Sequence, residues 1–240
     1  NAIAPDKRDR IIELLARADG DPDVRVVILA ATGRYFCAGA NVGHIGAAGT
    51  ADKHVGTAMR RIMGGAQRLI AAALDCGKPV IAAVQGPAAG LGAHLAFACD
   101  LVVAADGATF IEVFVRRGLV VDAGGAYLLP RRIGLQKAKE LAFLGDALDA
   151  REAHRLGLVN RVVPAEDLPE AVDELAQRLA AAPTSAITLT KKLFNSSLDG
   201  DRSASFLQEG MAQEMQSHAH DSAEGIAAFM ERRPPRFQGR

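Results

Sequence analysis

The sequence has no tryptophan, few other aromatic residues and no excess of either charge. Phe and Tyr together make up 5% of the 240 residues, and 28 basic residues balance 28 acidic ones. A nucleic-acid-binding surface typically combines a basic face with aromatic side chains on which bases stack. We therefore expect no nucleic-acid partner.

Long apolar runs and paired cysteines are also missing. No run reaches the roughly 20 residues that cross a bilayer, and the first residues do not resemble a signal peptide, so we expect no membrane partner. The three cysteines, Cys37, Cys76 and Cys99, are odd in number and far apart. This spacing predicts reduced thiols in a cytoplasmic protein.

The stretch from Val80 to Ala105 is apolar and rich in glycine. Val80–Val84 predicts a buried strand, the glycines after it predict a tight turn, and the small residues of 91–100 predict a helix that leads into a second strand, Leu101–Ala105. Free N–H groups at the start of such a helix can hold an oxygen that carries negative charge. A tight turn without chemistry is the alternative interpretation.

Strands and helices alternate over the first two thirds of the chain, and the last third is helical. Apolar periodicity predicts helices over residues 6–18, 54–75, 136–144 and 149–155, strands over 24–31 and 159–163, and four further helices after residue 166. Residues 32–49 form a predicted loop rich in glycine and alanine.

Five blocks of the sequence resemble the crotonase (enoyl-CoA hydratase/isomerase) superfamily, in the order in which that family has them. The blocks are Phe36–Asn41, Gly86–Asp100, Gly118–Gly125 followed by Leu129–Arg131, Ala150–Asn160, and Glu224–Phe237. The third block is most similar to enoyl-CoA isomerases of the phenylacetate-pathway type. The family's first pair of strands would precede Asn1.

The resemblance implies an α/β fold, a spiral of β-β-α turns followed by a C-terminal helical region. We expect residues 1–183 to form the spiral core with the CoA-thioester site, and residues 184–240 to serve oligomerisation and the CoA pocket. Family members form trimers, often paired into hexamers, so a homotrimer or a dimer of trimers is expected. They act on acyl-CoA thioesters, with CoA as part of the substrate, so no separate cofactor and no metal are expected.

The resemblance also implies the residues of the site. Ala38 and Leu91 match the two residues whose backbone N–H groups hold the thioester oxygen, although the family usually has glycine at the second position. Phe229 resembles a residue of the CoA pocket, often that of a neighbouring subunit. The expected substrate-binding residues are Ala40, Asn41, Gly90, Phe114 and Phe229.

Hydratases of the family use two glutamates, and this sequence has neither at the matching positions. His94 occupies the first position and Phe114 the second, while Glu112 is two residues away from it. Phenylalanine cannot transfer a proton. The sequence therefore argues against simple hydration by a pair of carboxylates.

Asp122 is the expected catalytic carboxylate, because it begins a turn of small residues and matches an acting carboxylate in several branches of the family. It also fits as an N-cap for the helix that follows, and the two roles are compatible. His94 is either a core residue or a partner of Asp122 in moving a proton.

These residues favour double-bond isomerisation in an enoyl-CoA, with a thioester enolate held by two N–H groups and a proton carried by Asp122. The alternatives are an enoyl-CoA hydratase, an aryl-CoA dehalogenase or thioesterase, and a non-catalytic binder of CoA esters.

Overall fold

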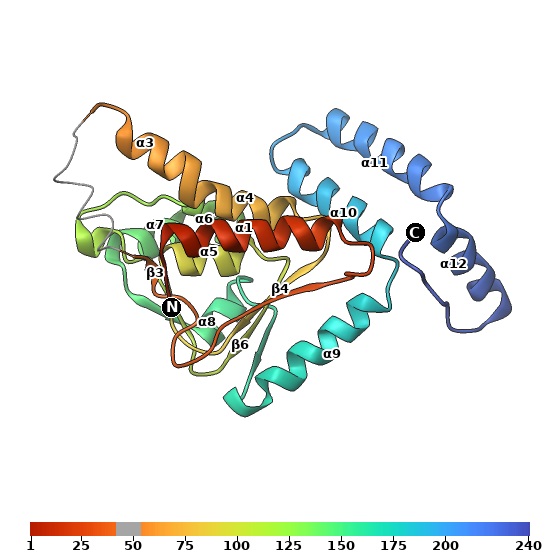
Figure 1. The fold of residues 1–240 in the computed structure, drawn as a ribbon, viewed down its shortest axis with the longest axis horizontal. Helices are drawn as coiled ribbons and strands as arrows, with labels where there is room; N and C mark the ends of the chain where they lie inside the picture. Colours follow the sequence, from red (N-terminus) through yellow and green to blue (C-terminus); the bar gives the residue numbers. More distant parts are fainter. Residues whose placement is uncertain (42–53) are drawn as a thin grey trace.

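The computed structural model describes residues 1–41 and 54–240, so part of the predicted loop 32–49 lies outside the described residues. Short parallel strands form the interior, and helices cover them on both sides (Figure 1). Helix α1 crosses the face seen in Figure 1, and α11 and α12 project from one end of the molecule.

The strands form small sheets that are mostly parallel. The four-stranded sheet has the order β2-β4-β6-β9, all parallel; β1 pairs with β3 in parallel; and β5-β7-β8 includes one antiparallel pair, β7 with β8. Their bounds are β1 Ala2–Ile3, β2 Val27–Ala30, β3 Gly39–Ala40, β4 Val80–Val84, β5 Ala88–Ala89, β6 Leu101–Ala105, β7 Thr109–Ile111, β8 Ala147–Asp149 and β9 Arg161–Val163.

The helices follow the strands in a β-β-α order through the core and then continue alone. Their bounds are α1 Pro5–Gly20, α3 Thr57–Arg61, α4 Gln67–Asp75, α5 Leu91–Ala98, α6 Gly125–Ile133, α7 Leu135–Leu144, α8 Ala150–Arg155, α9 Leu168–Ala180, α10 Thr184–Ser197, α11 Arg202–Ser217 and α12 His220–Glu231. Single turns are η1 Ile62–Ala66, η2 Val115–Arg117 and η3 Ala165–Asp167.

The predicted strand, turn and helix between Val80 and Ala105 are confirmed. Every residue of β4 is buried, as an apolar strand in the middle of a sheet should be. All eight residues of α5 are buried as well, which explains why its sequence has small and apolar residues on every face. The elements packed around α5 therefore hold the whole helix in a fixed position.

The helix predicted over residues 54–75 is confirmed from Thr57 to Asp75, but it contains a π-helical turn. The chain forms α3, then the π-helical turn η1, and then α4. A π turn adds one residue to the helical repeat and is frequent at functional sites. Here it changes which side chains face inward just where the helix passes the cavity described below.

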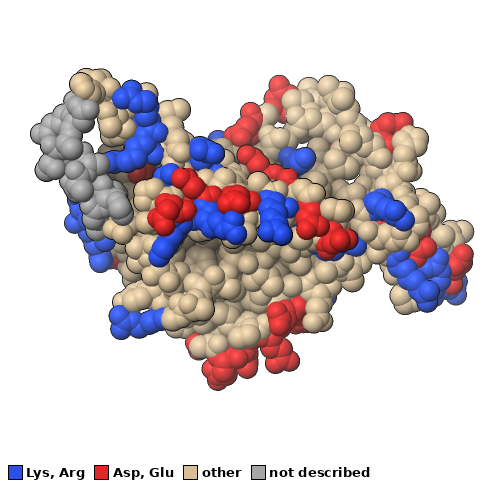
Figure 2. Space-filling model, viewed as in Figure 1, with Lys and Arg blue, Asp and Glu red and all other residues tan. Residues whose placement is uncertain are grey.

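The described surface has no face of a single charge sign in the view of Figure 2. Positive and negative side chains alternate along α1 and its neighbours. Within residues 1–41 and 54–240, no helix has the length and apolar character that a bilayer crossing requires.

A buried ion pair ties α10 to the core. Lys191 donates from Nζ to Asp100 Oδ2 at 2.8 Å and to the carbonyl oxygen of Ala73 at 3.2 Å. The same carboxylate oxygen accepts the N–H of Val80 at 2.7 Å, so one group joins the start of β4 to the end of α5. Lys191 is almost fully buried. The pair therefore fixes both ends of the strand-turn-helix unit.

We expect Lys191→Met to lower the free energy of unfolding by about 3 kcal/mol, because it leaves the Asp100 carboxylate partly buried without its counter-ion. Urea denaturation measures the change. The control is Lys192→Met, the exposed neighbour, which should change the free energy of unfolding by less than about 0.5 kcal/mol. Equal effects of the two substitutions would contradict this role of Lys191.

Candidate active site

A cavity of about 730 Å³ lies between α1, the η1 turn, the start of α5 and the loop before α6. Most of the residues expected in the site line it. They are Ala38, Ala40, Asn41, Gly90, Leu91, Phe114 and Asp122. The remaining wall is largely apolar and comes from the neighbouring residues Ile62, Ala66, Val113, Leu119, Val120 and Val121.

The start of α5 supplies one backbone donor to this cavity. Gly90, with φ +51°, turns the chain from β5 into the helix, and its carbonyl oxygen accepts the N–H of His94 at 3.0 Å. Leu91 is the first helical residue, and the N–H groups of a helix's first turn have no partner within the helix. The positive end of the helix dipole adds to their attraction for a negatively charged oxygen.

The Ala38 N–H does not play the part expected from the sequence. It donates to the carbonyl oxygen of Asn1, the residue before β1, at 3.2 Å. Asn41 donates to the carbonyl oxygen of Ile3 at 3.0 Å on the same side of β3. Ala40 lies between these two donors and borders the cavity. The Ala38 N–H is therefore already paired, and we take Ala40 as the candidate donor on this side of the cavity.

Gly39 allows β3 to approach the start of α5 closely. Its φ is +91°, and a Cβ atom at this position would lie 2.7 Å from the carbonyl oxygen of Ala89 and 3.8 Å from the nitrogen of Leu91. Any side chain would clash with that carbonyl and would also strain the backbone. Glycine at this position therefore keeps the Ala40 and Leu91 amides on adjacent segments.

Asp122 sits at the start of a strained turn. Ala123 has φ +47° and Gly124 has φ +78°, two left-handed residues in succession, and the N–H of Gly125 donates to the Asp122 carbonyl oxygen at 3.0 Å. A left-handed alanine costs energy and is held by its buried surroundings. The N-cap of α6 is Gly124, and no side chain caps this helix. N-capping by Asp122, the alternative suggested by the sequence, is wrong.

The Asp122 carboxylate makes no hydrogen bond to any residue that the structure describes, and it borders the cavity. Partial burial raises its pKa above the ordinary value for aspartate, while the charges of His94 and Arg61 act in the opposite direction. A carboxylate without partners and with a raised pKa can accept and return a proton.

His94 lies behind the cavity wall. Its side chain is wholly buried, and its Nε2 is 3.0 Å and 3.1 Å from the two carboxylate oxygens of Glu112. Its ring stacks on Phe114, which does line the cavity, with 5.5 Å between the ring centroids. Neither His94 nor Glu112 is among the residues that line the cavity. The sequence did not predict that these two side chains pair.

Phe229 does not reach this cavity within the single chain. It lies on α12 with 83% of its surface exposed. Cys37, next to Ala38, is buried, and burial raises the pKa of its thiol. A thiol that stays protonated at neutral pH is a poor nucleophile, so Cys37 acts as a small filler of the core.

Three arginines give the cavity a positive rim. Arg8 of α1, Arg61 of α3 and Arg117 of η2 all border it, against the single carboxylate of Asp122. Arg61 and Arg117 form no ion pair with any other described residue. This excess of unpaired positive charge suits a ligand with several negative groups.

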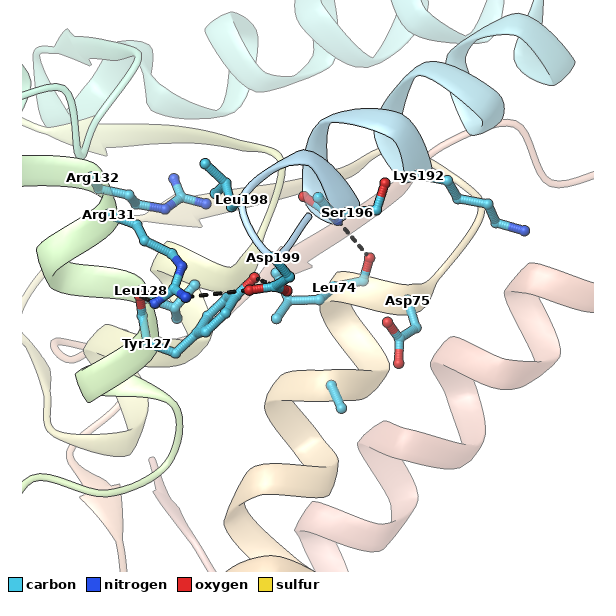
Figure 3. Close-up of a pocket in the computed structure, with 12 residues that line it drawn as sticks. Leu74, Asp75, Tyr127, Leu128, Arg131, Arg132, Lys192, Ser196, Leu198 and Asp199 are labelled. Carbon is cyan, nitrogen blue, oxygen red and sulfur yellow. Dashed lines mark hydrogen bonds and ion pairs between the residues drawn. The ribbon is translucent and has the colours of Figure 1, made fainter. Parts of the chain in front are cut away.

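A second cavity of about 660 Å³ lies between α4, α6 and α10, and Figure 3 shows it. Its central polar groups satisfy one another: Asp199 accepts the Tyr127 hydroxyl at 2.8 Å and an Arg131 N–H at 3.2 Å. The Arg131 guanidinium also lies over the Tyr127 ring. Because these groups are already paired, we place the candidate active site in the first cavity.

Within the described part of the chain, no group of three or more His, Cys, Asp or Glu side chains is arranged to hold a metal ion. The groups that border the candidate site are backbone amides, one carboxylate and the arginines described above.

The chain is similar over its whole length to known proteins. The family model described as enoyl-CoA hydratase/isomerase matches residues 1–240. A Rhodobacter capsulatus protein named "Probable enoyl-CoA hydratase" is 37% identical over 240 residues, which cover 100% of this chain and 90% of that protein. The 1,2-epoxyphenylacetyl-CoA isomerase of Escherichia coli K12 is 35% identical over 242 residues, with coverage of 100% and 91%.

A solved structure has the same fold. The crystal structure of an enoyl-CoA hydratase from Polaromonas sp. JS666 superposes with a TM-score of 0.92 at 34% identity. The match covers 98% of this chain and 91% of that one. The expected crotonase-type spiral of β-β-α turns with a C-terminal helical region is thereby confirmed.

The raised pKa of Asp122 predicts that its ionised form costs stability. A group whose pKa is higher in the folded state stabilises the fold below its unfolded pKa, about 4, and this stability is lost as the pH rises through the folded value. We therefore expect Asp122→Asn to have a higher urea midpoint than the parent protein at pH 7. The difference should shrink as the pH is lowered towards 4. A lower midpoint for the variant at every pH would contradict this assignment.

Proposed function

This chain belongs to the enoyl-CoA hydratase/isomerase family, and on that premise we propose that it moves the double bond of an enoyl-CoA thioester. The observation that carries the proposal is the single Asp122 carboxylate, without a partner, in a cavity whose described wall has no second acidic side chain. In the proposed reaction Asp122 takes a proton from C2 of a 3-enoyl-CoA and returns it to C4. The product is the conjugated 2-enoyl-CoA.

Removal of the C2 proton places negative charge on the thioester oxygen. We assign its stabilisation to the N–H groups of Ala40 and Leu91, which lie on the two segments that Gly39 brings together. Donors fixed in advance near a growing negative charge lower the barrier, and one such donor contributes about 3 kcal/mol. Neither donor titrates, so both act at any pH at which the protein is folded.

The residues around Asp122 favour isomerisation over hydration. Addition of water to a double bond needs one group to activate the water and another to protonate carbon. Phe114 occupies the position of one hydratase carboxylate, and both oxygens of Glu112 face His94 and not the cavity. One carboxylate is enough to carry a proton from one carbon to another.

The charge and the lining of the cavity support an acyl-CoA as the substrate. The phosphates of CoA would meet Arg8, Arg61 and Arg117, and the acyl chain would lie along the apolar wall. Beside Asp122 the described wall consists of Leu119, Val120 and Val121 and holds no second acidic side chain, so this part suits an uncharged hydrocarbon chain.

Assembly is part of the proposal, because the C-terminal helices expose apolar side chains. Phe206, Leu207 and Met211 of α11 are each more than 60% exposed, as is Phe229 of α12. We propose that second copies of the chain cover them, in a homotrimer or a dimer of trimers. Phe229 would then border the CoA-binding end of a neighbouring copy's cavity.

We expect Asp122→Asn to lower the rate of isomerisation of 3-hexenoyl-CoA at least about 100-fold, because asparagine cannot carry the proton. The rise in absorbance of the conjugated thioester measures this rate. Binding of the CoA ester, measured by calorimetry, should change little. Unchanged turnover would remove Asp122 from the mechanism. Rapid hydration of crotonyl-CoA by the parent protein, with no isomerisation, would replace the proposal by the hydratase alternative.

We expect Arg117→Gln to raise KM for the CoA ester about 5-fold or more, because a phosphate contact is lost. KM for the same acyl group on N-acetylcysteamine, which lacks the phosphates, should not change. Arg116→Gln is the matched control: its guanidinium is exposed, pairs with Asp146 and does not line the cavity. An equal rise in KM for both thioesters would show that Arg117 does not recognise phosphate.

A further inference from the structure

The turn that carries Asp122 leads into a helix with little stability of its own. Helix α6 is short, Pro130 in its interior has no N–H to donate, and no side chain of the described residues caps its start. The chain enters it through Ala123, whose φ of +47° is a left-handed value that costs an alanine energy. Such a conformation persists only where contacts around it hold the chain in place.

The core supplies these contacts on one side of the turn. A Cβ atom on Gly124 would lie 2.9 Å from Cγ2 of Ile70, and one on Gly125 would collide with the ring of His94. The backbone of the turn therefore packs directly on α4 and α5, and Ala123 between them is buried. These contacts fix the inner side of the turn and leave its outer side to other elements.

Close packing does not hold the outer side of α6. The second cavity, of about 660 Å³, separates this side of the helix from α4 and α10 (Figure 3). Leu128 borders the cavity from α6, Leu74 from α4 and Asn195 from α10. Side chains on opposite walls of such a space gain few van der Waals contacts from one another. The helix therefore depends on specific polar contacts on this side.

Asp199 makes these contacts from the connection between α10 and α11. Its two carboxylate oxygens accept the Tyr127 hydroxyl at 2.8 Å and an Arg131 N–H at 3.2 Å (Figure 3). Tyr127 and Arg131 are four residues apart on one face of α6, and the guanidinium carbon lies 3.9 Å from the centre of the Tyr127 ring. The three side chains thus join α6 to the C-terminal helices.

Backbone hydrogen bonds carry this connection to the Asp122 turn. Tyr127 lies in the first turn of α6, and its N–H donates to the Gly124 carbonyl oxygen at 3.0 Å. The N–H of Gly125 donates to the Asp122 carbonyl oxygen at 3.0 Å. Only three residues separate Tyr127 from the left-handed Gly124. A displacement of the Tyr127 side chain therefore moves the start of the helix and the turn before it.

We propose that Asp199, acting through Tyr127, is a positioning residue that holds the Asp122 turn in the orientation required for proton transfer. The tether comes from the C-terminal helices, and Asp199 itself does not touch the substrate. This inference rests on the proposed function, because it takes Asp122 as the group that carries the proton.

The test is Tyr127→Phe, which removes the hydroxyl and keeps the ring under Arg131. The Asp199 carboxylate is 54% exposed, so its ion pair with Arg131 contributes little by itself, and the hydroxyl contact is the one to remove. We expect kcat for 3-hexenoyl-CoA to fall about fivefold or more, because a displaced catalytic group loses its alignment with the substrate. KM should change less than about twofold, because the ligand contacts stay.

Asp199 gives the matching variants from the other side of the contact. Asp199→Ala should lower kcat by a factor similar to that of Tyr127→Phe, and it replaces that variant if the latter does not fold. Asp199→Asn keeps an oxygen for the Tyr127 hydroxyl and should retain most of the parent kcat. The double variant Tyr127→Phe/Asp199→Ala should be no slower than either single variant, because both remove the same contact. Effects that multiply in the double variant would contradict the proposal.

The matched control is Asp201→Ala, two residues further along the same connection. The Asp201 carboxylate caps α11 by accepting the Ala204 N–H at 2.9 Å, and it makes no contact with α6 among the described residues. This variant should lower the melting temperature and leave kcat unchanged. A merely structural role for Tyr127 would have the same outcome, so an unchanged kcat in Tyr127→Phe would overturn the proposal. An equal fall in kcat for Asp201→Ala would also overturn it.

Hydrogen–deuterium exchange separates this inference from the proposed function, because it needs no substrate. Amides of the segment 119–128 should exchange about tenfold faster in Tyr127→Phe than in the parent protein, since the turn opens more often. Exchange in α7, the next helix, should not change. Absence of isomerisation by the parent protein would refute the proposed function, whereas unchanged exchange of the segment 119–128 would refute the tether through Tyr127 and Asp199.

Discussion

The structure depends on the close approach of two backbone segments, the short strand Gly39–Ala40 and the strand-to-helix turn at Ala89–Leu91. Ala40 of the first segment and Leu91 of the second both border the cavity. The approach is possible only because Gly39 has no side chain. Buried elements then keep the two segments in place, since β4 and α5 are covered on every side and Lys191 fastens their ends through Asp100. Rigid burial would hold two ordinary amides in the fixed positions that the proposed site requires.

The elements around this site could be predicted from the sequence where burial alone decides. The apolar runs 80–84 and 101–105 can only be inner strands, and the small residues of α5 fit only a buried helix. The π turn at Ile62–Ala66 was missed, because a shift of one residue in the hydrogen-bond ladder leaves the apolar pattern almost unchanged. Likewise, the sequence could locate the glycine loop but not that the Ala38 N–H pairs with the carbonyl oxygen of Asn1, since the pairing of β1 with β3 decides that.

Pairing between distant side chains accounts for the rest of what was missed. His94 and Glu112 are 18 residues apart, on elements that meet only in the folded chain. A faint signal was present: Glu112 is the one charged residue between Thr109 and Val115 and follows a short strand, where a carboxylate needs a partner. Glu112 lies two residues from Phe114, the position that matches a hydratase glutamate, so the sequence did not predict it as a site residue. The spacing of Glu112 and Phe114 along the chain does not reveal where the Glu112 carboxylate points.

The arrangement of carboxylates also explains why one fold can host different reactions. A cavity that adds water must keep a water molecule beside two titrating groups. Here a phenylalanine fills one of those positions, and the nearest glutamate has turned inward to an imidazole. The apolar part of the wall offers a water molecule few hydrogen-bonding partners. The Asp122 carboxylate borders the same cavity and makes no hydrogen bond to a described residue. Moving a proton along the substrate needs no water at all. The same loss of polar groups supports the proposed isomerisation over hydration.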